Sequence, residues 1–377
     1  MLEFQYHLPV NLVFGRGKSD AIGKMAAALG SRALIVTGGS STKRSGLLSK
    51  TGSQLMDNGV TYVVFDKVAP NPLTTTVYEG AAIAAAEKCD MVIALGGGSS
   101  IDAGKGIAFQ AMNSGDINDY IFGRKISNKA LPILAVPTTC GTGSEGNGFA
   151  VMTNPDTMDK KSLRCSAIVP SCSIIDPLLM MTMPKATLAA VGFDALCHNI
   201  DGYISTISQP LTEMQALEGI RLAAKSLCHV YADQTNLENW DRLCLASTLG
   251  GMVINTAGVT ALHGMEHPAS GLKDIVHGRG LAALAPAVYE ESIAGAPEKF
   301  SNLSRLLGGK DEKDFVYRIR ELLKELHLTT TLGDQGIAET DVDWMAENCL
   351  KVSAASIANH PVLFGLEDIK RIYRKAI

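Results

Sequence analysis

The stretch "MVIALGGGSSIDAGKGIA" (91–108) indicates the fold, because an apolar run passes through three glycines directly into a helical pattern. Gly96, Gly97 and Gly98 let the backbone approach a ligand closely, and the first helical turn offers free N–H groups at the positive end of the helix dipole. Such a turn is typical of a phosphate or pyrophosphate site. It does not fit a Walker loop, since Gly106 stands where that loop needs Ser or Thr. The alternative is a tight strand-to-helix turn without a ligand.

Strand and helix patterns alternate around this stretch. "RALIVTGG" (32–39), "TYVVFDKV" (61–68) and "PILAVPTT" (132–139) are apolar over most of their length, and the segments at 45–59 and 74–90 have helical spacing. This alternation favours a Rossmann-like α/β domain, in which helices cover both faces of a parallel sheet. We expect one or two further strands at an edge of that sheet from the opening "FQYHLPVNLVFG".

Two β-rich segments between 149 and 177 predict a hairpin that closes this first domain. From about residue 185 helical periodicity replaces the strand pattern, and Pro177 and Pro184 suit a break between elements. We therefore predict an α/β domain over 1–183, an all-helical domain over 184–377, and a small-molecule site in the cleft between them. The expected helices in the second half include 187–205, 210–232, 236–271 with an interruption, 276–293 and 313–328.

Two further polar turns follow predicted strands. "PTTCGTGSEGNG" (137–148) offers hydroxyl groups between glycines, and a second such loop at the carboxyl end of a parallel strand favours a bound nucleotide. The turn "VTGGSSTKRSG" (36–46) lacks the carboxylate that would bind a free ribose 2′-hydroxyl, and it brings Lys43 and Arg44 instead. It therefore favours a phosphorylated ribose, with a solvated turn as the alternative. The candidate contacts in these two turns are Gly38, Gly39, Ser40, Ser41, Thr138, Thr139, Thr142 and Ser144.

Histidines and one aspartate have the spacing of a metal site. Asp194 and His198 lie four residues apart on a helical pattern, so both project from one face. His263 and His267 have the same relation, and His277 follows after a loop. A carboxylate with up to three imidazoles and no thiolate suits Fe(II), Zn(II), Mn or Co. Asp201 lies near the same face and is a less favoured ligand, and the alternative to a metal site is a buried polar cluster.

Composition narrows the class of protein. A hydrophobic content of 46% and a net charge of −4 describe a globular chain without a basic surface, so we expect neither nucleic acid nor membrane as a partner. The opening lacks a basic region followed by an apolar run, so it does not read as a signal peptide. The eight scattered cysteines form no CxxC pair, which favours free thiols and a cytoplasmic location.

Four segments together resemble the iron-dependent (group III) alcohol dehydrogenase family. They are "GGGSSIDAGKGIA", "PTTCGTGSE", "DALCHNIDGYIS" and "LHGMEHPASGLKDIVHG", in the family's order and spacing across essentially the whole chain. The resemblance implies the two-domain architecture of dehydroquinate synthase-like proteins and a homodimer. It implies the metal ligands Asp194, His198, His263 and His277, with His267 beside the metal and the nicotinamide. It also implies the cofactor contacts Gly97, Gly98, Ser99, Asp102, Thr138, Thr139, Thr142 and Lys160.

The implied activity is hydride transfer between nicotinamide C4 and a small aliphatic alcohol or aldehyde. A divalent metal, Fe²⁺ first and Zn²⁺ as the alternative, would lower the pKa of the alcohol, and His267 would relay the proton. Family members that prefer NAD carry an aspartate where this chain has Gly39, so NADP(H) is expected over NAD(H). The competing interpretations are a zinc-dependent glycerol (polyol) dehydrogenase of the same superfamily and a non-catalytic nucleotide-binding protein. The substrate's identity is left open by the sequence.

Three positions depart from the family's pattern. Gly146 and Asn147 stand where many members carry bulkier residues, so the substrate wall is expected to differ there. His360 stands where a polar or basic residue is expected, and the sequence gives it no role beyond that of an ordinary core or surface histidine.

Overall fold

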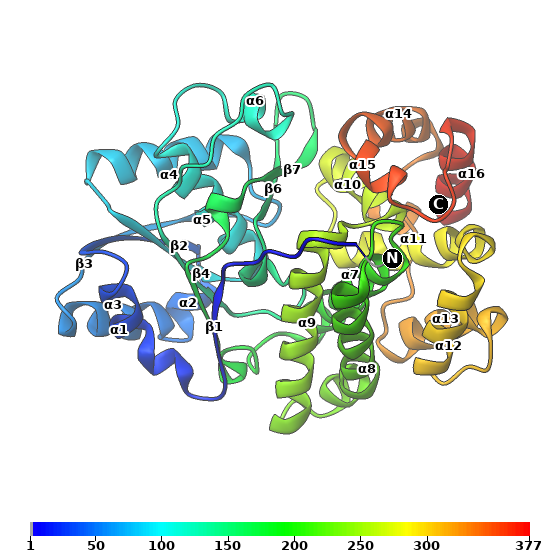
Figure 1. The fold of residues 1–377 in the computed structure, drawn as a ribbon, viewed down its shortest axis with the longest axis horizontal. Helices are drawn as coiled ribbons and strands as arrows, with labels where there is room; N and C mark the ends of the chain where they lie inside the picture. The colour runs from blue at the N-terminus through cyan, green and yellow to red at the C-terminus, as the bar shows by residue number, and fades with distance from the viewer. Residues whose placement is uncertain (1–2) are drawn as a thin grey trace.

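The computed structural model describes residues 3–377, and its first half is built on a six-stranded parallel sheet (Figure 1). Across the sheet the strands follow the order β1-β8-β5-β4-β2-β3. Every neighbouring pair is parallel, which confirms the predicted sheet. The strand bounds are β1 Asn11–Phe14, β2 Arg32–Gly38, β3 Thr61–Val68, β4 Met91–Gly96, β5 Ile133–Pro137 and β8 Cys172–Ile175.

Helices cover both faces of this sheet, as the continuous apolar strands predict. Leu34 and Val36 of β2 pack in one cluster with residues of α4 (Thr74–Ala86) and α5 (Gly98–Gln110). The alternate residues Ala33 and Ile35 pack on the other face with α1 (Ile22–Ala27) and α3 (Leu47–Asp57). Successive strand side chains point to opposite faces, so both faces of β2 must be apolar.

The strand order creates a crevice between β2 and β4. The chain leaves β2 for β3 on one side, and it leaves β4 for β5 on the other side. The connections therefore diverge at the carboxyl ends of β2 and β4, where ligands of open α/β sheets bind. The glycine-rich turn and the polar turn after β5 both open onto this edge.

The hairpin predicted over 149–177 is correct only in its first part. β6 (Phe149–Thr153) and β7 (Lys160–Arg164) form an antiparallel pair outside the main sheet. Cys172–Ile175 instead returns to the main sheet as β8, between β1 and β5. All four residues of β8 are buried, and a fully buried strand suits the middle of a covered sheet better than a hairpin.

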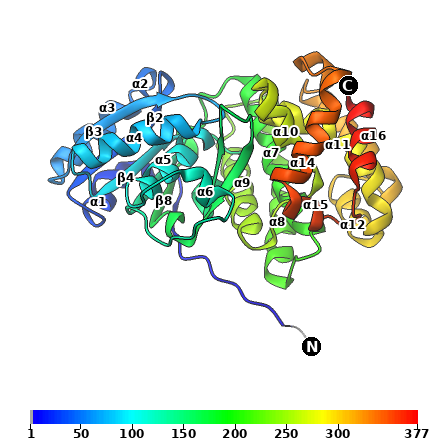
Figure 2. The ribbon, with the colours of Figure 1, turned by 90° about the horizontal axis from the view of Figure 1, so that it is seen from above.

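The opening segment supplies one strand, β1, at the edge of the sheet. Residues 3–10 carry no regular structure and run out from the body of the molecule (Figure 2). Two hydrogen bonds tie this segment to the helical half: the Tyr6 hydroxyl donates to Gln215 Oε1 at 3.4 Å and accepts from Gln215 Nε2 at 3.2 Å.

The second half is helical, as predicted (Figure 1). Its helices pack around one large apolar cluster. The predicted interruption in 236–271 lies at Gly258, whose φ of 65° ends α9, and the chain turns by 101° into α10. The division at 183/184 stays a prediction. The helices are α7 Lys185–Ile204, α8 Pro210–Ala232, α9 Leu237–Ala257, α10 Ala261–Lys273, α11 His277–Ser292, α12 Pro297–Leu306, α13 Phe315–Glu325, α14 Val342–Val352, α15 Ala354–Ala358 and α16 Leu366–Ala376.

Within residues 3–377, no single helix combines the length and the apolar character needed to cross a bilayer. Only α9 and α10 taken together reach that length and composition, and they are separated by their sharp bend.

Candidate functional site

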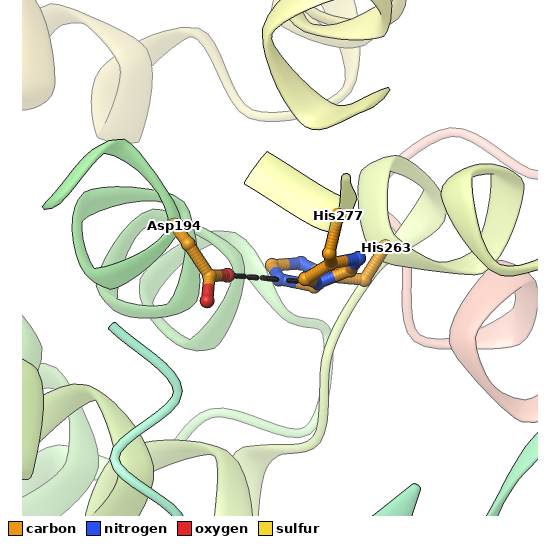
Figure 3. Close-up of side chains that lie close together, drawn as sticks. All are labelled: Asp194, His263 and His277. Carbon is orange, nitrogen blue, oxygen red and sulfur yellow. Dashed lines mark hydrogen bonds and ion pairs between the residues drawn. The ribbon is translucent and has the colours of Figure 1, made fainter. Parts of the chain in front are cut away.

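Three helices bring the four predicted metal ligands together. Asp194 and His198 are one turn apart on α7, His263 lies in the first turn of α10, and His277 opens α11. Asp194 Oδ1 lies 3.3 Å from His198 Nδ1, 3.4 Å from His263 Nε2 and 3.6 Å from His277 Nε2. Figure 3 shows the rings of His263 and His277 facing this carboxylate. We call these four residues the metal corner.

The geometry of the metal corner fits a divalent cation. Two ligands about 2.1 Å from a tetrahedral metal lie about 3.4 Å apart, close to the separations around Asp194 Oδ1. One ligand atom from each of Asp194, His263 and His277 lies within 4.8 Å of the other two. The buried Nδ1 of His198 has no hydrogen-bond partner among residues 3–377. One carboxylate and three imidazoles suit iron or zinc.

Two buried carboxylates orient the rings of the metal corner from behind. Asp201 Oδ2 lies 2.8 Å from His263 Nδ1 and also accepts the backbone N–H of Thr260. Glu266 Oε2 accepts a hydrogen bond from His277 Nδ1. In both rings Nε2 is left facing Asp194, the arrangement by which proteins fix the tautomer of a metal ligand.

The sequence pattern places Asp201 near the ligand face and does not single out Glu266. The structure puts Asp201 behind His263 rather than beside the cation position. A signal for Glu266 was present, because it lies three residues after His263 on a helix that is otherwise almost free of charge up to Lys273. A buried acid on such a helix requires a partner.

Nearby positive charges keep the carboxylates of Asp194 and Glu266 ionised. Burial raises the pKa of Asp194, but the nearby His198 and His263 outweigh it and hold that pKa well below its usual range. Burial likewise opposes ionisation of Glu266, yet His277 and Lys160 lower its pKa to about 2. These negative charges favour a cation.

The two fully buried rings of the metal corner differ in protonation. Burial lowers the pKa of His198 to about 4, so this ring is neutral near pH 7. Burial also opposes the charged form of His263, but Asp201 and Asp194 together raise its pKa to about 9. A cation that takes the Nε2 of His263 would therefore release a proton.

His267 lines the same cleft without joining the metal corner. Its ring centroid lies 6.0 Å from that of His277, and no hydrogen bond links the ring to any residue between 3 and 377. Burial and the positive charge of Lys160 hold the pKa of His267 well below its usual range. The neutral ring is able to accept a proton, and its role as a relay stays a prediction.

The glycine-rich turn forms a cradle across the cleft from the histidines. Gly98 begins α5, and no side chain caps the first turn of that helix. A Cβ on Gly98 would lie 2.4 Å from Thr142 Cγ2, so the two predicted cofactor loops approach too closely for any other residue. The backbone N–H of Thr138 donates to Gly96 O at 2.9 Å and joins the loops. The free N–H groups and the helix dipole fit a pyrophosphate.

A cleft of about 810 Å³, open to solvent, joins the two sides. Its lining brings together most of the predicted residues, namely Gly98, Ser99, Asp102, Thr142, Lys160, His198, His263, His267 and His277. Asp194 is buried and does not line this cavity. The predicted contacts that do not line this cavity are Gly38, Gly39, Ser40, Ser41, Gly97, Thr138 and Thr139.

A buried lysine, Lys105, which was not among the predicted site residues, fixes the loop after β5. Lys105 Nζ donates to Ser144 O at 2.5 Å, Asn147 Oδ1 at 3.0 Å and Phe149 O at 2.8 Å. Asp102 accepts from Ser144 Oγ at 2.5 Å and from the Val151 N–H at 3.0 Å. We call Asp102, Lys105, Ser144 and Asn147 the lysine cluster.

The lysine cluster gives Asp102 protein partners at both oxygens, so its predicted contact with the cofactor stays a prediction. A signal for Lys105 was present in the sequence, because it is the one cation in the helix "GSSIDAGKGIAFQ". Lys160 is buried at the inner end of the cleft. Its amine donates to Asn71 Oδ1 at 2.9 Å and lies 3.7 Å from Glu266 Oε2.

The turn after β2 bears on the choice of cofactor. Ser41–Arg44 forms one helical turn, α2, with Gly39, Ser40 and Ser41 exposed. Lys43 pairs with Asp66, while Arg44 donates to Ser40 Oγ at 2.8 Å and has no acidic partner within residues 3–377. One of the two predicted cations is thus already neutralised.

Two of the departures noted in the sequence have structural explanations. His360 is a buried core histidine: its Nδ1 accepts the Ala261 N–H at 3.4 Å, and its Nε2 lies 2.8 Å from Ser292 Oγ. Gly146 faces α9 rather than the cleft, where a Cβ would lie 3.1 Å from Met252 Cγ. Asn147 does line the cleft.

Comparisons with known proteins agree with this geometry. Residues 9–177 match the family model described as iron-containing alcohol dehydrogenase, and residues 188–377 match the model for the C-terminal part of that family. The chain is 36% identical to 1,3-propanediol dehydrogenase of Klebsiella pneumoniae, over 99% of this chain and 98% of the relative. It is 31% identical to NADH-dependent butanol dehydrogenase A of Clostridium acetobutylicum, over the full length of both. The crystal structure of an archaeal alcohol dehydrogenase from a Red Sea brine pool superimposes with a TM-score of 0.96 at 32% identity, over the full length of both chains.

Proposed function

The chain belongs to the iron-containing alcohol dehydrogenase family, and from this premise we propose that it is a metal-dependent, NAD(P)-linked alcohol dehydrogenase and aldehyde reductase. It would transfer a hydride between nicotinamide C4 and a small aliphatic alcohol or aldehyde. One observation carries the proposal: three ring nitrogens face one carboxylate oxygen in a cleft that also holds an uncapped glycine-rich helix start.

Asp194, His198, His263 and His277 would hold the metal, with Fe²⁺ as the first candidate and Zn²⁺ as the second. When bound, a divalent cation acts as a Lewis acid toward an alcohol or carbonyl oxygen. The protein's contribution is orientation and charge. Asp201 and Glu266 fix the tautomers of two rings, and the surrounding burial excludes water.

His267 is our candidate for moving the proton. Its ring lines the cleft near His277, and because its pKa is low the ring is neutral near pH 7 and has an unprotonated nitrogen. The substitution His267→Ala should lower the rate and change its pH profile. An unchanged rate and profile in this variant would remove His267 from the mechanism.

We propose NADP(H) over NAD(H) as the cofactor. The turn after β2 has no carboxylate to repel a 2′-phosphate, and Arg44 has no acidic partner within the described chain. The matched variant Gly39→Asp adds that carboxylate. It should move the ratio of kcat/KM for NADPH over NADH towards NADH by at least about 10-fold, since a like charge then faces the phosphate. An equal or reversed preference in the unmodified enzyme would contradict the proposal.

We also propose a cytoplasmic homodimer. The eight cysteines are free thiols in the structure, as a reducing compartment requires, and the family resemblance is the support for a dimer. Sedimentation of the purified enzyme would decide its oligomeric state.

The central experiment removes and restores the metal. The enzyme is dialysed against a chelator, analysed for metals, and assayed for NAD(P)H oxidation with a panel of short aldehydes and for the reverse reaction with 1-butanol, 1,3-propanediol and glycerol. Activity should fall at least about 100-fold and return with Fe²⁺ or Zn²⁺. Full activity in metal-free protein would rule out the metal proposal. A marked preference for glycerol would favour the polyol dehydrogenase interpretation instead.

A further inference from the structure

The hairpin of β6 and β7 forms one wall of the cleft. Phe149 pairs directly with Arg164, and Val151 with Ser162. Alternate strand residues share a face, so these residues and Lys160 point the same way, and all five line the cleft. The hairpin therefore presents two cations to the site, one at each end of the cleft-facing part of β7.

These two cations differ in their partners. Lys160, at the inner end, has the acid Glu266 at 3.7 Å and the amide of Asn71 at 2.9 Å. Arg164 lies four residues along the strand, which puts its Cα atom about 13 Å from that of Lys160. Its guanidinium makes no ion pair and no hydrogen bond with any residue in the described range 3–377. Its one close neighbour of note is the ring of Phe149, with Cζ 4.7 Å from the ring centroid.

The guanidinium lies against the Phe149 ring, and no residue within 3–377 occupies its N–H groups. A guanidinium is charged at every working pH and forms paired hydrogen bonds with carboxylates, sulfonates and phosphates. Arg164 also lines a second hollow, under His7 and Pro9, so it stands at the outer end of the cleft. A cleft with the metal corner at one end and the unpartnered guanidinium of Arg164 at the other suits a molecule that is polar at both ends.

We propose that Arg164 determines substrate specificity by binding an anionic group at the end of the substrate opposite the reacting oxygen. This inference rests on the proposed function. It narrows the substrate class to short hydroxy acids and their aldehyde counterparts, such as an ω-hydroxycarboxylate. The apolar side chains Val151, Ile254 and Val259, which also line the cleft, would contact the methylene groups between the two ends.

The nucleotide is a less suitable partner for Arg164. The cradle for its phosphates lies at Gly98 and Thr142, which belong to the sheet edge rather than to the hairpin. If Arg164 instead bound the nucleotide, its removal would raise KM for the nucleotide.

The test compares acids with neutral amides of the same shape. The metal-loaded enzyme is assayed with the series from 3-hydroxypropanoate to 6-hydroxyhexanoate and with the matching hydroxyamides. In the unmodified enzyme the best acid should exceed its amide in kcat/KM by about 10- to 100-fold, the usual value of a charge-assisted hydrogen bond. Arg164→Met should abolish this preference by raising KM for the acids, and it should leave kcat/KM for 1-butanol within about threefold of the unmodified enzyme. Arg164→Lys should restore part of the preference.

Lys161→Met is the control. It removes a positive charge from the same strand, but Lys161 turns away from the cleft, with its amine 5.5 Å from the centroid of the Phe122 ring. Its acid-to-amide ratio should equal that of the unmodified enzyme. A ratio that survives Arg164→Met overturns the proposal, as does an equal loss for acids, amides and butanol, or a rise in nucleotide KM alone.

A binding measurement separates this inference from the proposed function. Calorimetry of the metal-loaded enzyme with butanedioate, which is not oxidised, should show binding that Arg164→Met weakens about 10- to 100-fold. Binding that depends on Arg164 without turnover of any alcohol would refute the dehydrogenase proposal and retain the anion site. Turnover of neutral alcohols without anion binding would do the reverse.

Discussion

The metal corner and the lysine cluster are both buried, polar and charged, and both border the cleft. Within residues 3–377, only the lysine cluster has its hydrogen bonds satisfied by the protein. Every hydrogen of the Lys105 amine finds an acceptor within the protein, and Asp102 is satisfied at both oxygens. In the metal corner, three ring nitrogens face one carboxylate oxygen, and His198 Nδ1 has no partner in the described chain.

This difference separates scaffolding from a ligand site. A buried polar group without a partner costs stability, so a chain retains such a group where something outside the chain completes it. The lysine cluster fixes the loop after β5, whereas the metal corner would be completed by the proposed cation. Substitutions in the two clusters should therefore affect different measurements.

The largest expected effect is on activity, from His198→Ala. This change removes one proposed metal ligand and no hydrogen bond at Nδ1, so we expect kcat/KM to fall by about 10³-fold while the fold is kept. Metal content by elemental analysis should fall in parallel. The control His229→Ala replaces an exposed histidine and should match the parent in both measurements. A fully active His198→Ala enzyme would contradict the assignment.

The next effect is on stability, from Lys105→Met. Its loss leaves four acceptor contacts unfilled and Asp102 without its cation, so the free energy of unfolding should fall by about 3–5 kcal/mol. Denaturant unfolding measures this change. Lys50→Met, which breaks an exposed pair with Asp20, should cost under about 1 kcal/mol. If Lys105→Met unfolds at the parent's denaturant midpoint, the lysine cluster is not scaffolding.

The smallest effect is on the pH dependence of stability and comes from His360, whose two ring nitrogens both have hydrogen-bond partners. Burial lowers its pKa to about 4, partly offset by Asp201. The unfolded chain takes up this proton near pH 6.5, before the folded chain does, so stability is full above pH 6.5 and is lost as pH falls towards 4. The loss reaches about 3 kcal/mol, and His360→Gln should remove that part of the pH dependence in unfolding experiments. An identical pH dependence in parent and variant would show that the pKa of His360 is the same in the folded and the unfolded chain.

The parts of the fold that sequence reasoning predicted depend on neighbours in the chain. The glycine turn at 96–98 and the i, i+4 pair of Asp194 and His198 are local patterns, and the structure shows both as expected. The position of β8 in the middle of the sheet depends on pairing with β1 and β5. A short apolar run carries no information about which strand it will join.

The same limit applies within the site. His263 and His267 have equivalent spacing, and the sequence alone did not separate them. In the structure only His263 has a carboxylate, Asp201, behind its ring, and that residue is 62 positions away. The sequence likewise did not identify Arg164 as a site residue, because only the folded chain shows that its guanidinium lines the cleft without an ion-pair partner.

The placement of β8 also dictates an order of events during synthesis. β1 is synthesised before β8, its one strand partner among residues 3–377, which follows about 160 residues later. At translation rates of about 5–20 residues per second, the edge strand waits roughly 10–30 s for that partner. The first half of the chain therefore completes its sheet only when the boundary of the helical half is being made, and the nascent chain carries an open sheet edge until then.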